Sequence, residues 1–176
     1  MKLHSLNIEI VQGNIVNQPD ISAIVNAANP ELRIGGGVAG AIHQASGPQL
    51  TVECKAFAPI KPGEAVITSA PNLPNNHVIH CLGPVYGRDK PEDKLLANCY
   101  KNAMELAEKY KINSIAFPAI STGAYGYPIE KATDVVISTI RAFSKHAKHL
   151  QNIRFVLFSQ HDLKVYQEKF ESHLNV

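Results

Sequence analysis

The segment IVNAANPELRIGGGVAGAIHQASG, residues 24–47, joins an apolar run to a helical pattern through a loop rich in glycine. Its first residues belong to the run 22–27, which is short and apolar and therefore predicts a buried strand. After the glycines, apolar residues recur at the spacing of one face of a helix, at Val38, Ala41, Ile42 and Ala45. A strand that leads through a loop into a helix is the repeating unit of α/β proteins.

The rest of the chain repeats this alternation. Further strands are predicted at residues 6–11, 64–70, 77–82, 114–119 and 152–158. A helix is predicted to start at Pro48, with Leu50, Cys54 and Phe57 facing inward. A longer helix is predicted over 94–110, with Tyr110 at the end of its inward stripe, and another over 129–147. A last helix is marked by an apolar stripe at Leu163, Tyr166, Phe170 and Leu174. The pattern predicts one α/β domain over residues 1–176, built on a central, largely parallel sheet, and this length suits one full core.

Three loops that follow predicted strands hold the polar and glycine-rich motifs. They are NAANPELRIGGG (26–37), ISTGAYGYP (120–128) and FSQHD (158–162). In open α/β sheets, ligands bind beyond the carboxyl ends of the strands. We therefore expect these loops to meet at one edge of the sheet and to form the functional site there.

Composition narrows the class of protein. The formal net charge of +2 is too small to indicate nucleic acid, and we interpret the basic tract KHAKH (145–149) as a solvated helix surface rather than a binding patch. Cys54, Cys81 and Cys99 are odd in number and form no CxxC motif, which argues against a disulfide framework or a zinc site. No signal peptide and no apolar run of ~18 residues is found, so we expect a cytoplasmic protein without a membrane span.

The glycine run must first be tested as a dinucleotide fingerprint. Gly35, Gly37 and Gly40 do satisfy the spacing G-x-G-x-x-G. That fingerprint needs its glycines directly after the strand and an acidic residue about 20 positions further on, at the end of a second strand. Here Gly35 lies nine positions after Asn26, and the nearest downstream acid, Glu53, falls in a predicted helix. We therefore set the dinucleotide interpretation aside.

A phosphate site explains the glycines better. Glycine lets the backbone approach a ligand closely and adopt positive φ, and a helix N-terminus offers unpaired N–H groups. The alternative is that the glycines pack the loop against the sheet. A second loop, STGAYG (121–126), again offers glycines and hydroxyl groups before a predicted helix. Two such loops on one edge suit a diphosphate, with Tyr125 either packing on a sugar or anchoring its own loop.

The segments IVNAANPELRIGGGVAGAIHQASG and FPAISTGAYGYP resemble the two signature loops of the macrodomain family. VIHCLGP (78–84) and QGNI (12–15) are also similar to that family, and the resemblance spans essentially the whole chain. It implies a three-layer α/β/α sandwich with a mixed, largely parallel sheet. It also implies that the protein binds ADP-ribose and uses no metal or redox cofactor.

The resemblance assigns a role to each matching position. Asn14 would contact the adenine amino group, the backbone of Ile15 a ring nitrogen, and Phe158 would stack on adenine. Asn29 would hold the hydroxyl groups of the terminal ribose. The diphosphate would lie between two walls, formed by Gly36, Gly37, Val38 and Ala39 on one side and by Ser121, Thr122, Gly123, Ala124, Tyr125 and Gly126 on the other.

Two positions depart from the family pattern. The family usually has Asp at the position of Asn14, and Asn keeps an acceptor oxygen without the charge, although it is equally suited to capping a turn. One branch of macrodomain hydrolases reads GGGVDG, whereas this chain has Ala39, and the loop's one remaining carboxylate is Glu31. Losing a general base typically costs about 10²–10⁴ in rate. In other members with Ala there, the substrate's own phosphate is thought to hold the attacking water.

His43 is a further candidate acid or base. It follows Ala39 by four residues and therefore shares its helical face, and the ordinary pKa of histidine suits proton transfer. The alternative is a structural histidine that bonds a neighbouring loop.

The sequence thus predicts a monomeric hydrolase that releases ADP-ribose from an ester, either to an acidic protein side chain or in O-acetyl-ADP-ribose. Asn29 and His43 are its candidate catalytic residues. Two alternatives stay open: a reader that binds ADP-ribose without cleaving it, favoured by Ala39, and a protein that binds RNA or poly(ADP-ribose) through a basic surface.

Overall fold

The computed structural model describes residues 1–174. Its strands are β1 (Lys2–Leu3), β2 (Leu6–Gln12), β3 (Ala23–Ala27), β4 (Ala65–Ser69), β5 (His77–Cys81), β6 (Ser114–Phe117) and β7 (Asn152–Leu157). Its helices are α1 (Gly37–Ser46), α2 (Pro48–Cys54), α3 (Glu92–Lys109), α4 (Ile129–Ser144) and α5 (Gln160–Leu174).

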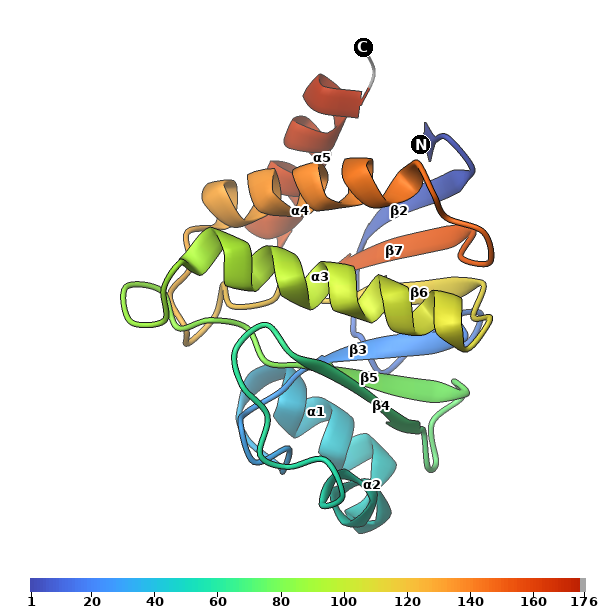
Figure 1. Ribbon diagram of the computed structural model, residues 1–176, viewed down its shortest axis with the longest axis vertical. Coiled ribbons are helices and arrows are strands. Elements are labelled where there is room, and N and C mark those ends of the chain that lie inside the picture. Colours follow the sequence, from blue (N-terminus) through green and yellow to red (C-terminus); the bar gives the residue numbers. More distant parts are fainter. Residues whose placement is uncertain (175–176) are drawn as a thin grey trace.

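All strands of the described chain belong to one sheet, in the order β1-β2-β7-β6-β3-β5-β4 (Figure 1). The five central strands run parallel, and β1 and β4 pair antiparallel at the two edges. One core cluster joins the sheet to α3, α4 and α5, and a second joins its other face to α1 and α2. The predicted three-layer α/β/α sandwich with a mixed, largely parallel sheet is confirmed.

The central strands read as apolar runs because both faces of the sheet are covered. Every residue of β6 is buried, as are the first four residues of β3. The break between α1 and α2 is caused by two neighbouring residues. Gly47 adopts φ 90°. Pro48, at the start of α2, supplies no N–H and has a fixed φ that suits a first helical turn.

Some sequence predictions were wrong in detail. The strand β1 was missed because two residues give no readable period. Phe57 was expected to face inward but is exposed, since α2 already ends at Cys54, and Tyr110 is exposed because α3 ends one residue before it. In α1 the spacing identified the helix but not the buried face, which consists of Ala39, Ile42, His43 and Ser46.

The parallel strands all end at one edge of the sheet, called here the carboxyl edge. Read across the sheet, the loops that leave it follow β2, β7, β6, β3 and β5 in that order. Neighbouring strands lie about 4.8 Å apart, so these five loops span roughly 19 Å. This order fixes which predicted ligand contacts can be neighbours.

Candidate functional site

The first loop leads from β3 to α1 and ends in a helix start without a side-chain cap. Gly36 is the N-cap residue, and no acidic residue occupies the first turn. Among residues 1–174, no acceptor takes the N–H groups of Gly37, Val38 and Ala39. Unpaired N–H groups and the positive end of the helix dipole make this loop suitable for an anion.

The four glycines of this loop divide into two pairs. A Cβ added at Gly36 or Gly37 would meet nothing within 4 Å, and Gly37 has φ 55°. By contrast, a Cβ at Gly40 would lie 2.5 Å from the backbone oxygen of Gly35, and one at Gly35 would lie 2.9 Å from Nδ2 of Asn29. The phosphate and packing explanations of the glycine run therefore each account for one pair.

The Asn29 side chain closes the loop on itself. Its Nδ2 donates to the backbone oxygen of Arg33 at 2.7 Å, and its Oδ1 accepts from the N–H of Arg33 at 3.1 Å. One N–H hydrogen and one lone pair of the amide remain for a ligand. Ala39 is buried at 4% exposure, so its methyl group fills space inside the loop.

The second loop leads from β6 to α4 and presents its backbone. The N–H groups of Thr122, Gly123, Ala124 and Tyr125 have no acceptor within the described chain, whereas those of Gly126 and Tyr127 close the turn. The hydroxyl groups expected to help point elsewhere. Thr122 Oγ1 donates to Ala119, and Ser121 Oγ is buried against Gly83, where an added Cβ would lie 2.1 Å from it.

The start of α4 does not add a second anion site of the expected kind. Pro128 occupies its N-cap position and Glu130 its first turn. A carboxylate there already complements the helix dipole. The second wall of the site therefore depends on the loop's own N–H groups.

Tyr125 serves as an anchor of its loop in this structure. The ring is half-buried against the second core cluster, and its backbone oxygen accepts from the N–H of Tyr86 at 2.9 Å. Burial raises the pKa of the Tyr125 hydroxyl, whose surroundings also include the charges of Arg88, Asp89 and Glu31. Arg88 and Asp89 belong to the loop after β5, which the sequence analysis did not assign to the site.

At the β2 and β7 end, Phe158 and Asn14 follow neighbouring strands. Phe158 is 89% exposed. Exposing an aromatic ring to water is unfavourable, so this position suits a ligand that stacks on the ring. Asn14 Oδ1 accepts from the N–H of Val16 at 3.1 Å, which is the turn-capping role left open as the alternative. The side chain of Ile15 is buried at 5% exposure, so this residue can offer only its backbone.

Comparison with known proteins identifies the family of this arrangement. A model of the Macro domain matches residues 25–136, which include both glycine loops. The chain belongs to the macrodomain family.

Relatives and solved structures of macrodomains extend over nearly the whole chain. A macro domain-containing protein of Methanosarcina mazei is 47% identical over 93% of this chain and 88% of its own length. The O-acetyl-ADP-ribose deacetylase of Klebsiella pneumoniae is 44% identical over 94% of this chain and 97% of its own. A Gly-to-Val variant of the Oceanobacillus iheyensis macrodomain, solved with ADP-ribose, superposes with a TM-score of 0.94 at 39% identity and covers 100% of this chain and 98% of that one. The Trypanosoma brucei macrodomain with ADP-ribose gives 0.86 at 37% identity, covering 92% of this chain and 68% of that one.

In this macrodomain, His43 belongs to a buried polar cluster rather than to the exposed loop. It is 3% exposed, its Nδ1 lies 3.1 Å from Thr51 Oγ1, and its ring centroid lies 6.5 Å from that of His80. Burial lowers the pKa of His43. These contacts support the structural alternative, and we no longer propose His43 as an acid or base.

His80, from the VIHCLGP motif, lies at the centre of that cluster. Because Thr68 Oγ1 donates to Ser69, it must accept from Nε2 of His80 at 2.9 Å. His80 Nδ1 is then the acceptor for Nδ2 of Asn26 at 3.0 Å, so the ring is held neutral in one tautomer. Burial, together with the neighbouring His43, lowers the pKa of His80 to about 3.

Other features of the macrodomain bear on cofactors and location. Within residues 1–174, no group of three or more His, Cys, Asp or Glu side chains could hold a metal ion. The three cysteines are buried and unpaired. A search of the described helices finds none with the length and apolar character needed to cross a membrane.

Proposed function

We propose that this macrodomain binds ADP-ribose along the carboxyl edge of its sheet. The observation that carries the proposal is the pair of loops after β3 and β6, which are adjacent strands, each with a run of N–H groups lacking an acceptor. Two such donor runs after neighbouring strands suit the oxygens of a diphosphate. The solved structures of the related macrodomains with ADP-ribose support this choice of ligand.

The order of the loops gives the ligand a direction. Phe158 and Asn14, at the β7 and β2 end, would hold adenine, and Asn29, after β3, would face the terminal ribose. The diphosphate lies between them because the β6 loop lies between these strands. The bond to a carrier would then emerge toward the loop after β5, near Arg88.

We further propose that the protein hydrolyses ADP-ribosyl esters, as the name of the Klebsiella relative suggests for that enzyme. Hydrolysis consumes one water molecule and yields ADP-ribose and a carboxylic acid, either acetate or an acidic side chain. With Ala39 in place of an Asp, the one carboxylate left in the glycine loop is that of Glu31, which is exposed. The bound diphosphate would hold the attacking water, and Asn29 would orient the ribose, so positioning supplies the rate enhancement.

Titration calorimetry with ADP-ribose, followed by a release assay on glutamate-linked mono-ADP-ribosylated protein and on O-acetyl-ADP-ribose, tests both statements. We expect binding with release from at least one ester. Binding without release would instead establish the reader alternative, for which Ala39 is the supporting observation. Absence of binding would show that Asn14 and the loops do not form the site.

The variant Ala39→Asp separates the two roles. Residue 39 is third in α1, where a carboxylate favours the helix N-terminus but also repels a diphosphate. We expect weaker ADP-ribose binding and an unchanged or faster release rate at saturation. A slower rate at saturation would mean that Ala39 is part of a working geometry rather than a lost base.

A further inference from the structure

The opposite edge of the sheet, called here the amino edge, has a different character. The helices α3 and α4 lie side by side on one face and both end at this edge (Figure 1). Lys109 is the last residue of α3, and the segments 110–113 and 145–151 follow the two helix ends. They are more than 30 residues apart in sequence, so the sequence pattern gave no reason to consider them together.

Glu108 holds these two segments against each other. Its carboxylate accepts hydrogen bonds from the N–H groups of Lys148, His149 and Leu150 at 2.9–3.1 Å. The backbone oxygen of Asn113 accepts from residues 151 and 152 at 2.9 and 3.0 Å. The tract KHAKH is thereby placed beside the tract KYK (109–111).

The result is a cluster of exposed basic side chains, the basic edge, formed by the lysines Lys109, Lys111, Lys145 and Lys148 together with His146 and His149. None of its four lysines forms a salt bridge within residues 1–174, and Glu108 is fully used by backbone donors. Elsewhere on the surface, Lys101 pairs with Glu105 and Lys164 with Glu168. A single cation at the C-terminal end of each helix would be enough to complement the dipoles of α3 and α4. The cluster contains more positive charge than this.

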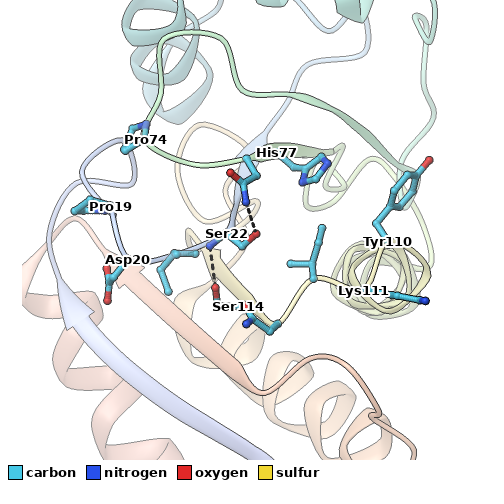
Figure 2. A pocket seen from close by; sticks show the side chains of 12 residues that line it. Pro19, Asp20, Ser22, Pro74, His77, Tyr110, Lys111 and Ser114 are labelled. Carbon is cyan, nitrogen blue, oxygen red and sulfur yellow. Dashed lines mark hydrogen bonds between the residues drawn. The ribbon is translucent and has the colours of Figure 1, made fainter.

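An aromatic ring and a hollow adjoin these cations. Tyr110 is 48% exposed, with Lys109 Nζ 5.7 Å from its ring centroid and the His77 ring 6.1 Å away. The hollow has a volume of about 480 Å³, with Tyr110 and Lys111 on one side and Asp20 on the other (Figure 2). The polar side chains along it are Ser22, Asn76, His77, Asn113 and Ser114.

Hydrogen bonds between its polar residues hold the hollow together, and one polar atom of its lining lacks a partner. Its floor is joined by bonds from the N–H of Ser22 to Ser114 Oγ at 2.8 Å and from Asn76 Nδ2 to Ser22 Oγ at 3.3 Å (Figure 2). His77 Nδ1 is buried without a partner. Arg154 holds the Asp20 carboxylate at 2.8 and 2.7 Å, which reduces its repulsion of an anion.

We propose that the basic edge binds single-stranded nucleic acid, with phosphates on its lysines and one base in the hollow beside Tyr110. A positive surface interleaved with an aromatic platform is the usual design of sites for single strands. Amide, hydroxyl and imidazole groups of the hollow can bond the edge of a flat base, which an acidic peptide would leave unused. This replaces the interpretation of residues 145–149 as a merely solvated surface, and it is independent of the ADP-ribose site.

Fluorescence anisotropy with a labelled single-stranded RNA of about 12 nucleotides tests the proposal, since such sites span roughly 4–16 nucleotides. The protein is saturated with ADP-ribose so that the carboxyl edge is blocked. Four lysine–phosphate contacts predict a slope of log K against log salt near −3, hence roughly 50-fold weaker binding at 200 mM than at 50 mM salt. Lys111→Gln combined with Lys148→Gln should halve that slope, and Tyr110→Ala should weaken binding at least about fivefold.

The matched control is Lys101→Gln combined with Lys164→Gln, which changes net charge equally at the two paired, exposed sites. It should leave RNA affinity within about twofold, and all variants should bind ADP-ribose normally. The proposal is wrong if the control weakens RNA binding as much as the basic-edge variant does. It is equally wrong if the RNA binds free protein but not protein saturated with ADP-ribose, or if polyglutamate competes for the edge and Tyr110→Ala has no effect.

Discussion

Gly36 and Gly40 are four positions apart, but an added methyl group would meet different surroundings at each. At Gly36 the space is open and φ is −83°, so alanine fits the backbone there. We expect Gly36→Ala to leave the free energy of unfolding within about 0.5 kcal/mol and to weaken ADP-ribose binding roughly tenfold, because the methyl group enters the ligand's space. Calorimetry and thermal unfolding of the same sample measure both effects.

Gly40→Ala should affect the stability of the fold more than it affects ADP-ribose binding. Alanine favours a helix interior by about 1 kcal/mol, but its Cβ would lie 2.5 Å from the Gly35 oxygen, and relieving such overpacking typically costs about 1–3 kcal/mol. We expect the melting temperature to fall by about 2–6 °C. An unchanged or higher melting temperature would mean that the loop shifts freely and that its packing on α1 is not a constraint.

The residues predicted to offer backbone groups at the carboxyl edge depend on local features of the sequence. Glycine spacing and a helix start are local properties, and they predicted the free N–H groups of Gly37 and Val38. Side-chain directions depend on tertiary neighbours and were less predictable. Ser121 turns its hydroxyl to Gly83, and His43 turns inward to Thr51, contacts that join residues far apart in sequence or on different helices.

For helices and strands too, local features could be predicted from the sequence and tertiary neighbours could not. The alternation of strands and helices predicted the parallel sheet, since covered faces leave an apolar signature in each strand. It did not predict that β4 runs antiparallel or that the loop after β5 contacts Tyr125, because pairing partners are not encoded in a local period. The motif VIHCLGP, which ends in Gly83 and Pro84, was the available signal for that loop.

The joint between α3 and the segment after α4 gives a prediction about elements. Burial alone would raise the pKa of Glu108, but bonds from the N–H groups of Leu150, His149 and Lys148 outweigh it, and the pKa is lowered. A lowered carboxyl pKa adds stability above about pH 4.3, which is lost as the pH falls through the folded-state value. Glu108→Gln keeps one acceptor oxygen and should destabilise the fold by about 1–3 kcal/mol at pH 7, measured by urea unfolding.

The control for this prediction is Glu105→Gln, one turn earlier on α3, whose carboxylate pairs with Lys101 at the surface. Exposed pairs contribute little, so its effect should stay below about 0.5 kcal/mol. If the two variants unfold at the same urea concentration, Glu108 does not join the segments in solution.

At the scale of the whole molecule, the buried histidines predict how stability depends on pH. In the unfolded chain His80 binds a proton below about pH 6.5, whereas in the fold its pKa is lowered to about 3. A lowered histidine pKa means that full stability is present above pH 6.5 and declines as the pH falls toward 3. We expect about 2 kcal/mol less stability at pH 5 than at pH 7, and somewhat more if His43 contributes.

Urea unfolding of the wild type and of His80→Gln at both pH values measures this effect. Glu108 and Asp20, whose carboxyl pKa values are lowered, lose their contributions only at more acidic pH, so the window from pH 5 to 6.5 isolates the histidines. The variant should be less stable than the wild type at pH 7, but its free energy of unfolding should change less between pH 7 and pH 5. If the free energy of unfolding of the variant depends on pH as strongly as that of the wild type, the responsible proton binds to a residue other than His80.

The unpaired donors of the two glycine loops belong to the main chain, and this limits what genetics can reveal about them. Replacing one residue by alanine leaves its N–H in place, so a conventional scan of positions 122–125 would pass over the groups that we propose contact the ligand. The amide would have to be changed itself, by assembling the segment with an ester linkage that deletes one donor at a time. For the same reason, the site can persist through wide drift in side chains, provided that the loops keep their torsion angles.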